Sequence, residues 1–207
     1  MRIIETQADV AEGAAWLRAR CPRMAAALDL IGAPPLRRRA EGFASLLNAI
    51  VGQQVSTAAA AGIWARMQAA GFDDEDIVRA ATDEDLRAAG LSRAKARYAR
   101  ALAEARLDYA GLGKTPEDVA VAMLTSVPGV GRWTAEVYLM FAVGHADVFA
   151  PGDLALREAA RSLYGLPERP TIPELETMAL DWRPWRGVAA RILFTYYRVD
   201  KGREGAP

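Results

Sequence analysis

The chain has 207 residues, of which 52% are hydrophobic and 25% charged, and its 26 basic and 26 acidic residues cancel to a net charge of zero. This composition is typical of a soluble globular protein with one large core or two small lobes. No apolar run approaches the roughly 20 residues that a membrane span needs. The balanced charge argues against a generally adhesive nucleic-acid binder but permits a local basic face.

Cysteine and histidine are almost absent. Cys21 is the only cysteine, which excludes a disulfide or a cysteine-ligated cluster within the chain. His145 is the only histidine, and since it follows Gly144 in an expected loop, we expect it at the surface without a role. The chain starts Met-Arg-Ile-Ile-Glu, with an early acidic residue and no apolar signal core, so we expect a cytoplasmic protein.

Apolar residues recur at helical spacing along most of the chain, and almost no stretch shows the period-two alternation of strands. We therefore predict an all-α fold. The longer predicted helices cover residues 11–20, 24–31, 41–50, 57–70, 93–105, 117–126, 134–143, 154–164, 173–181 and 185–199. Two shorter helices are expected between them, one opened by the acidic residues 73–76 and one that begins at Thr82 and stops at Gly90.

Several of these helices begin with residues that favour a helix start. Ser56 or Thr57 can cap the helix at 57–70, and Ser92 can cap the helix at 93–105. Thr82 followed by Asp85 matches a variant of the capping box. The basic run 37–39 and the basic residues of helix 93–105 are interpreted as solvated surfaces, with contacts to DNA as the alternative.

A glycine-rich turn, Pro128-Gly129-Val130-Gly131, separates the helices predicted at 117–126 and 134–143. Its length and its glycines favour a tight hairpin between two helices. Amides at the start of the second helix would point outward and, together with the helix dipole, would favour a phosphate oxygen. Taken alone, the same turn could equally be a helix connection without a ligand.

The hairpin is one of four motifs that occur in order along the chain. The others are Asn48–Ser56, Ala89–Ser92 with Lys95-Ala96, and Trp182–Arg186, while the hairpin motif itself extends over Val127–Arg157. From about Phe43 to Thr195 the chain thereby resembles the helix-hairpin-helix DNA glycosylases, and among them the 3-methyladenine DNA glycosylase II (AlkA-type) branch. The cysteine count removes the iron–sulfur subgroup of that superfamily.

This resemblance implies a fold and a domain organisation. We expect residues 1–207 to form a single glycosylase domain of two helical lobes, with the active-site cleft between them and the hairpin at about 117–143. Relatives that carry an N-terminal β-lobe are longer, and this chain has no room for a β-lobe of comparable size.

The resemblance also implies a catalytic residue, Asp153, because the catalytic aspartate of the family aligns with it. From its local sequence alone Asp153 is an N-cap, since Pro151-Gly152 precedes it and a helix follows. Some relatives have a second acid at the position of Gly152, so here one carboxylate would act alone. That carboxylate would stabilise the positive charge that develops on the deoxyribose and orient the attacking water.

Aromatic residues are the implied binding site for the flipped base. Trp133 aligns with the family's pocket position, Phe194 aligns near a second pocket aromatic of the family, and Tyr138 and Tyr197 are weaker candidates. An electron-rich ring would attract a cationic alkylated base, whereas packing in the core is the alternative for each of them. A tyrosine of some relatives is replaced by Val137, which predicts a wider pocket. Trp182 and Trp185 are expected to be structural, holding the last helix against the helix of Asp153.

DNA contacts are implied at two loops. The short loop at 52–55 carries the family's wedge residue, which aligns with Gln54 where several relatives have leucine; ordinary polar loop residues are the alternative. We expect the DNA-binding residues to be Gln53, Gln54, Ser56, Gly129, Val130, Gly131, Arg132 and Thr134. No metal or cofactor is predicted except a possible monovalent cation on the hairpin carbonyls.

These inferences predict a DNA-3-methyladenine glycosylase that excises alkylated bases from double-stranded DNA in base excision repair and is associated with the nucleoid. Tryptophan at position 133 replaces the lysine with which bifunctional relatives form a Schiff base, so no strand-nicking lyase activity is expected. We expect a monomer with no membrane partner. The alternatives are a non-catalytic DNA-binding protein that keeps the hairpin, and a glycosylase for oxidised or mismatched bases.

Overall fold

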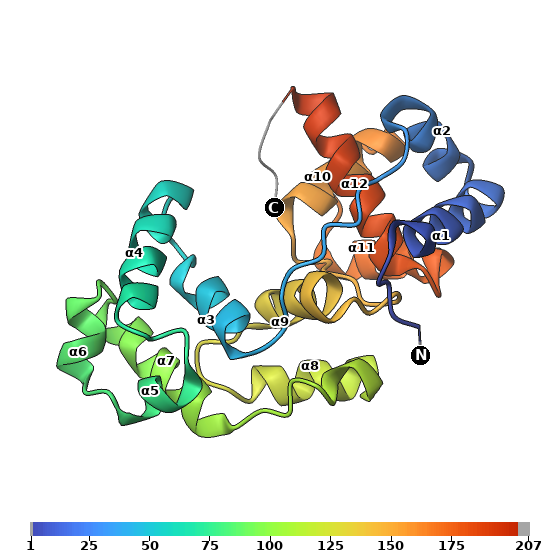
Figure 1. The fold of residues 1–207 in the computed structure, drawn as a ribbon. Helices are drawn as coiled ribbons and strands as arrows, with labels where there is room; N and C mark the ends of the chain where they lie inside the picture. Colours follow the sequence, from blue (N-terminus) through green and yellow to red (C-terminus); the bar gives the residue numbers. More distant parts are fainter. Residues whose placement is uncertain (1, 203–207) are drawn as a thin grey trace. The chain divides into compact units, whose positions relative to one another are not determined.

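The computed structural model describes residues 2–202, and the chain folds into two compact helical units whose elements are labelled in Figure 1. The first unit comprises Met1–Arg38 and Leu139–Pro207, and the second comprises Arg39–Tyr138. The first unit is thus built from both ends of the chain, whereas the second is one uninterrupted segment. None of the helices within residues 2–202 combines the length and apolar character needed to cross a membrane.

The first unit is assembled around the last helix, α12 (Arg186–Lys201). Every residue from Gly187 to Phe194 is buried, as is typical of a helix that is packed on all sides. Helix α12 packs against helices near both ends of the sequence, namely α1 (Gln7–Arg20), α2 (Pro22–Ile31) and α10 (Leu154–Tyr164). The unit also contains α11 (Ile172–Ala179), the 3-10 turn Leu180–Trp182 and the π-helical turn Leu139–Val143.

A buried arginine, Arg191, interrupts this apolar helix. Its guanidinium donates hydrogen bonds to three backbone carbonyls, those of Leu36 at 2.9 Å, Gly187 at 2.8 Å and Met140 at 3.0 Å, and it lies over the Phe141 ring. Burial, followed by the nearby arginines of residues 37 and 38, lowers the pKa of Arg191 to about 10. The side chain joins α12 to the segments of Leu36 and Met140 within the first unit, and the three carbonyls satisfy its buried guanidinium.

The second unit contains the remaining helices. In chain order they are α3 (Phe43–Val51), α4 (Thr57–Ala69), α5 (Glu75–Ala80), α6 (Asp83–Ala88), α7 (Arg93–Ala105), α8 (Glu117–Thr125) and α9 (Arg132–Tyr138). Helix α7 is the central packing element, because α3, α5 and α6 all contact it. Helices α8 and α9 pack against each other as the two arms of the hairpin.

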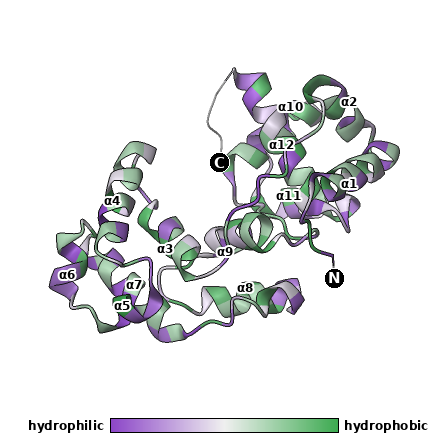
Figure 2. Cartoon of the chain, in the orientation of Figure 1, coloured by the Kyte–Doolittle hydropathy of each residue, from purple (hydrophilic) through white to green (hydrophobic). Residues whose placement is uncertain are grey.

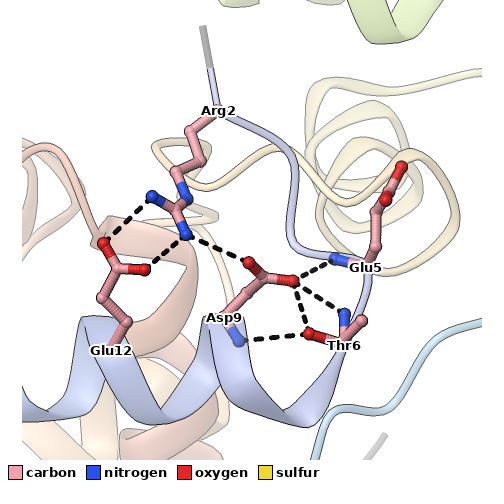
Figure 3. Close-up of polar contacts among 5 residues, drawn as sticks. All are labelled: Arg2, Glu5, Thr6, Asp9 and Glu12. Atoms are coloured by element: carbon pink, nitrogen blue, oxygen red, sulfur yellow. Dashed lines mark hydrogen bonds and ion pairs between the residues drawn. The ribbon is translucent and has the colours of Figure 1, made fainter.

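Capping side chains define many of the helix starts. Within residues 2–202 three complete capping boxes occur, in which Thr6 pairs with Asp9, Thr82 with Asp85, and Thr171 with Glu174. Figure 3 shows the first of them, where the Asp9 carboxylate accepts hydrogen bonds from the amides of Glu5 and Thr6 and from the Thr6 hydroxyl. Arg2 adds an ion pair from the guanidinium to Asp9 and a second pair to Glu12.

The all-α prediction is confirmed for the described residues, in which the helices at 93–105 and 154–164 have the predicted bounds. The helix expected from residue 41 begins at Phe43, because Gly42 has a φ of +101° that is incompatible with a helix. The helix expected at 134–143 begins at Arg132 and becomes a π-helical turn after Tyr138. The residues of this turn, Leu139–Val143, are all apolar, and every residue from Thr134 to Ala146 is buried. Figure 2 colours the chain by hydropathy.

The expectation of a surface histidine is wrong, because His145 is only 1% exposed. An extended N-terminal segment covers it: Ile3 and His145 form an antiparallel β-bridge. The Ile4 amide donates to the Gly144 carbonyl at 2.7 Å, and the Ala146 amide donates to the Arg2 carbonyl at 3.0 Å. This pairing joins residues more than a hundred positions apart, which local periodicity cannot predict.

Candidate functional site

The turn between α8 and α9 is a tight hairpin in which the two glycines meet different surroundings. The Val130 amide closes the turn by donating to the Val127 carbonyl at 3.0 Å. Gly129 has a φ of +93°, and a Cβ there would lie 2.4 Å from the Tyr98 ring. Gly131 has no protein atom within 4 Å of the place where a Cβ would lie. The fold therefore requires glycine at 129, whereas at 131 glycine leaves the outer face of the turn open.

The other residues that we predict to contact DNA at the hairpin differ in exposure. Val130 and Thr134 are buried, and the Thr134 hydroxyl accepts a hydrogen bond from Gln53. Arg132 is exposed and donates a 2.8 Å hydrogen bond to Glu136, whose carboxylate is almost fully buried. We did not predict Glu136 as a site residue, although its i,i+4 spacing from Arg132 is the usual signal for such a pair.

The loop between α3 and α4 separates the two glutamines of its motif. The Gln53 side chain points to the hairpin, where Nε2 donates to the Gly129 carbonyl at 3.1 Å and to the Thr134 hydroxyl at 3.3 Å. Gln54 is exposed and has a φ of +57°. Ser56 caps α4 by accepting from the Ala59 amide at 3.2 Å. Gln54 is thus the member of the pair that is presented to solvent.

Lys95 holds this loop from the other side, although sequence reasoning placed it among solvated basic residues. Its ammonium donates 2.7 Å hydrogen bonds to the carbonyls of Val51 and Gln53. Burial lowers the pKa of Lys95. The ammonium lies at the C-terminal end of α3, where a cation is favourable.

The predicted aromatic residues have different environments. Trp133 is 42% exposed, which leaves part of its indole accessible within α9. Tyr138 is buried, and its hydroxyl oxygen accepts a hydrogen bond from the Gly42 amide at 2.8 Å. Burial raises the pKa of Tyr138 to about 12. Tyr138 is therefore a core residue that fixes the start of α3, as the packing alternative describes, and its contact with the base stays a prediction.

Phe194 also belongs to the core. It has no exposed surface, and its ring packs on Phe141 with centroids 5.9 Å apart. It lies on the fully buried part of α12. Its environment is that of a core residue, which is the alternative to a role in the base pocket. Tyr197, one turn further on, is half-buried.

Asp153 is the N-cap of α10 in the first unit. Its Oδ1 accepts hydrogen bonds from the Ala155 amide at 2.8 Å and the Leu156 amide at 3.1 Å. The side chain is fixed by these amides and the residue is 6% exposed, although its neighbours Gly152 and Leu154 are both exposed. The cap predicted from the local sequence is present, and it holds one carboxylate oxygen in a defined orientation.

The Trp182–Arg186 motif holds the segment that leads to Asp153. Asp147 accepts 2.9 Å hydrogen bonds from both Arg183 and Arg186, and Phe149 packs edge-on against Trp182 with centroids 5.4 Å apart. Trp182 also donates to the Tyr164 hydroxyl of α10 at 3.3 Å, as expected of a structural residue.

Trp185 was expected to join the last helix to the helix of Asp153, but it packs on α1 instead. A Cβ at Gly13 would lie 2.7 Å from its ring, and the Arg2 guanidinium lies over the same ring.

Comparisons with known proteins fit this arrangement. Residues 47–186 match the model of the HhH-GPD superfamily base excision DNA repair proteins. The Bacillus halodurans DNA-3-methyladenine glycosidase structure is 30% identical with a TM-score of 0.84, covering 98% of this chain and 95% of that one. The Schizosaccharomyces pombe 3-methyladenine DNA glycosylase bound to abasic DNA is 25% identical with a TM-score of 0.74, covering 92% and 97%.

A match to a longer protein agrees with these. The Escherichia coli DNA-3-methyladenine glycosylase 2 is 32% identical over 72% of this chain and 55% of its own length. This chain therefore corresponds to about half of the E. coli enzyme. The family match covers the loop of Gln53, the hairpin, Asp153 and the tryptophan motif, and this chain belongs to the HhH-GPD superfamily of base excision DNA repair proteins.

Proposed function

We propose that the protein is a monofunctional DNA glycosylase that excises alkylated bases, 3-methyladenine among them, from double-stranded DNA. The observation that carries this proposal is Asp153, a nearly buried carboxylate held by two amides of α10. Relatives named as 3-methyladenine DNA glycosylases, including the E. coli enzyme and the S. pombe enzyme in complex with abasic DNA, support the choice of substrate.

The proposed reaction breaks the bond between the base and C1′ of the deoxyribose. Positive charge develops on the sugar as this bond lengthens, and a fixed carboxylate stabilises that charge. Asp153 would also orient or deprotonate the attacking water. A base alkylated on a ring nitrogen already carries positive charge and leaves readily, so the reaction does not require a second catalytic acid.

The base has to leave the duplex before the bond can be attacked. The partly exposed indole of Trp133 is the candidate surface for stacking, because its electron-rich face attracts a cationic base. Gly131 and the amides beside it would bind a phosphate at the open face of the hairpin.

The decisive experiment separates the charge of Asp153 from its role as a cap. Asn is as good an N-cap as Asp, so Asp153→Asn should keep the thermal stability and the affinity for duplex DNA. Loss of the charge should lower single-turnover release of 3-methyladenine from alkylated duplex DNA by about 100-fold or more.

The matched control is Asp74→Asn. Asp74 caps α5 with the same geometry, accepting from the Asp76 amide at 2.8 Å and the Ile77 amide at 3.1 Å. This variant should release bases at the wild-type rate. If wild type and both variants bind the duplex but release no base, the protein is a non-catalytic DNA-binding member of the superfamily. An active Asp153→Asn variant would reduce Asp153 to a helix cap.

We also propose that the protein lacks strand-nicking lyase activity. A lyase forms a covalent imine with the sugar through an amine, and Trp133 has none. Sodium borohydride added during turnover should therefore trap no protein–DNA adduct, whereas a bifunctional glycosylase assayed in parallel should be trapped. An adduct with this protein would contradict the proposal.

Two further properties stay proposals. A monovalent cation at the hairpin would be held by backbone carbonyls, which suit a hard cation, although the Gly129 carbonyl already accepts from Gln53. The protein is expected to act as a monomer, and sedimentation with and without DNA tests this.

A further inference from the structure

Two loops of the second unit are tied together by side chains that the proposed reaction does not use directly. Gln53 Nε2 donates to the Gly129 carbonyl at 3.1 Å and to the Thr134 hydroxyl at 3.3 Å, so the loop at 52–55 is joined to both sides of the hairpin turn. Lys95 Nζ donates to the Val51 and Gln53 carbonyls at 2.7 Å each. The loop is therefore bonded on two sides.

The same helix that holds the loop also supports the hairpin. Lys95 and Tyr98 lie three residues apart on α7, a spacing that puts them on one face of the helix. Tyr98 packs so closely on Gly129 that a Cβ there would lie 2.4 Å from its ring. Helix α7, the loop and the hairpin turn thus form one cross-linked cluster within the second unit.

The residue at the tip of this cluster is Gln54. It is exposed, and its φ of +57° is a left-handed conformation that non-glycine residues rarely adopt. Such a backbone persists only when its surroundings determine it. The bonds to the preceding residue, from Lys95 to the Gln53 carbonyl and from the Gln53 side chain to the hairpin, supply that constraint.

We propose that Gln53 and Lys95 are positioning residues that hold Gln54 at a fixed place relative to the phosphate-binding face of the hairpin, so that it can fill the gap left by a flipped base. This inference rests on the proposed function. A wedge residue must keep a fixed position relative to the bound phosphate. A mobile side chain would move aside when the duplex approaches and would not insert into the base stack. In this proposal Gln53 acts through Gln54, in place of the direct DNA contact that the sequence predicts for it.

The test compares one lesion in two duplexes, one in which base pairing opposes flipping and one in which it does not. Single-turnover excision is measured on a 3-methyladenine analogue paired in a duplex and on the same lesion opposite an abasic site, where pairing no longer opposes flipping. Gln53→Glu keeps the size of the side chain and removes the donor. It should slow excision from the paired duplex by about tenfold or more and excision opposite the abasic site by a much smaller factor.

Lys95 provides a second, independent variant with a rescue. Lys95→Met should reproduce the selective loss on the paired duplex, and Lys95→Arg, which keeps a cation and donors, should recover most of the rate. The matched control is Gln68→Ala, an exposed glutamine of α4 in the same unit, which should leave both rates unchanged. Circular dichroism and thermal melting establish that each variant is folded.

A double-mutant cycle then tests whether Gln53 acts through Gln54. Adding Gln53→Glu to Gln54→Ala should cause little further loss on the paired duplex. Additive losses would mean that Gln53 contributes separately and would overturn the inference, as would equal losses on both substrates in folded variants. A wild-type protein that excises neither lesion would instead overturn the proposed function, and the positioning role with it.

Discussion

Gly129 and Gly131 lie two residues apart in the hairpin turn, yet the structure gives glycine a different purpose at each. Gly129 has a φ of +93°, and the Tyr98 ring packs so closely on it that an added methyl group would overlap the ring. Gly131 faces open space. A glycine that the fold does not require is explained if a ligand's backbone approaches there, as a phosphate would in the proposed function.

This contrast makes a paired prediction. Gly129→Ala should lower the free energy of unfolding by about 1–3 kcal/mol, because both backbone strain and overlap oppose it. Gly131→Ala should leave stability within about 0.5 kcal/mol of wild type, as is usual for surface changes, while weakening duplex binding. Urea unfolding and DNA titrations measure the two effects. A Gly131→Ala variant with unchanged affinity would argue against a phosphate contact at that amide.

Some roles of single residues follow from local sequence, and others do not. The cap at Asp153 could be predicted, because the Pro-Gly-Asp pattern before a helix is a local signal. Phe194 could not be assigned, since an aromatic at helical spacing looks the same in a pocket and in a core. Lys95 was misread as a solvated base because its partners are backbone carbonyls, which leave no trace in the sequence.

At the scale of the helix, the start of α1 shows how one carboxylate can make stability depend on pH. Asp9 accepts from the Thr6 hydroxyl, the Thr6 and Glu5 amides and Arg2, in that order of importance, and these bonds hold the pKa of Asp9 well below its usual value. A carboxylate with a lowered pKa stabilises the fold above its unfolded pKa of about 3.9. This stabilisation is lost as the pH falls from there towards the folded pKa.

We therefore expect Asp9→Asn to be less stable than wild type at pH 7, by about 1 kcal/mol or less, because Asp9 is only partly buried and its partner Arg2 is exposed. The difference should be constant from pH 7 down to about pH 5 and should shrink progressively below about pH 4. Urea unfolding of both proteins across this range measures it. A difference that does not change with pH would mean that the ionised carboxylate contributes nothing.

Helix periodicity located most elements because most helices bury one face, and a buried face repeats at 3.6 residues. The π-helical turn Leu139–Val143 escaped prediction, since its residues are apolar on every side and carry no periodic signal. The capping box at Thr82 and the cap at Ser92 were predictable because both depend on side chains close in sequence.

For the molecule as a whole, the sequence predicts the fold class and the family but not the packing partners. Local patterns do not reveal that residues 2–4 pair with residues 144–146, or that Arg191 donates to carbonyls of Leu36 and Met140. These contacts join distant parts of the chain, and they explain the wrong expectation for His145. Local patterns likewise do not reveal the boundary at Tyr138, which falls where α9 continues into the π-helical turn, whereas the other boundary, at Arg38, lies in an irregular segment.

The central place of α12 in the first unit has a consequence for synthesis on the ribosome. Helices α1 and α2 are translated first, but α12, against which both pack, is translated last. The whole second unit leaves the ribosome before α12 is synthesised. It can therefore fold while the first unit still lacks its central helix. Nascent chains arrested before residue 186 should therefore protect residues 39–138 from protease while residues 2–38 stay sensitive, and early protection of the N-terminal helices would contradict this order.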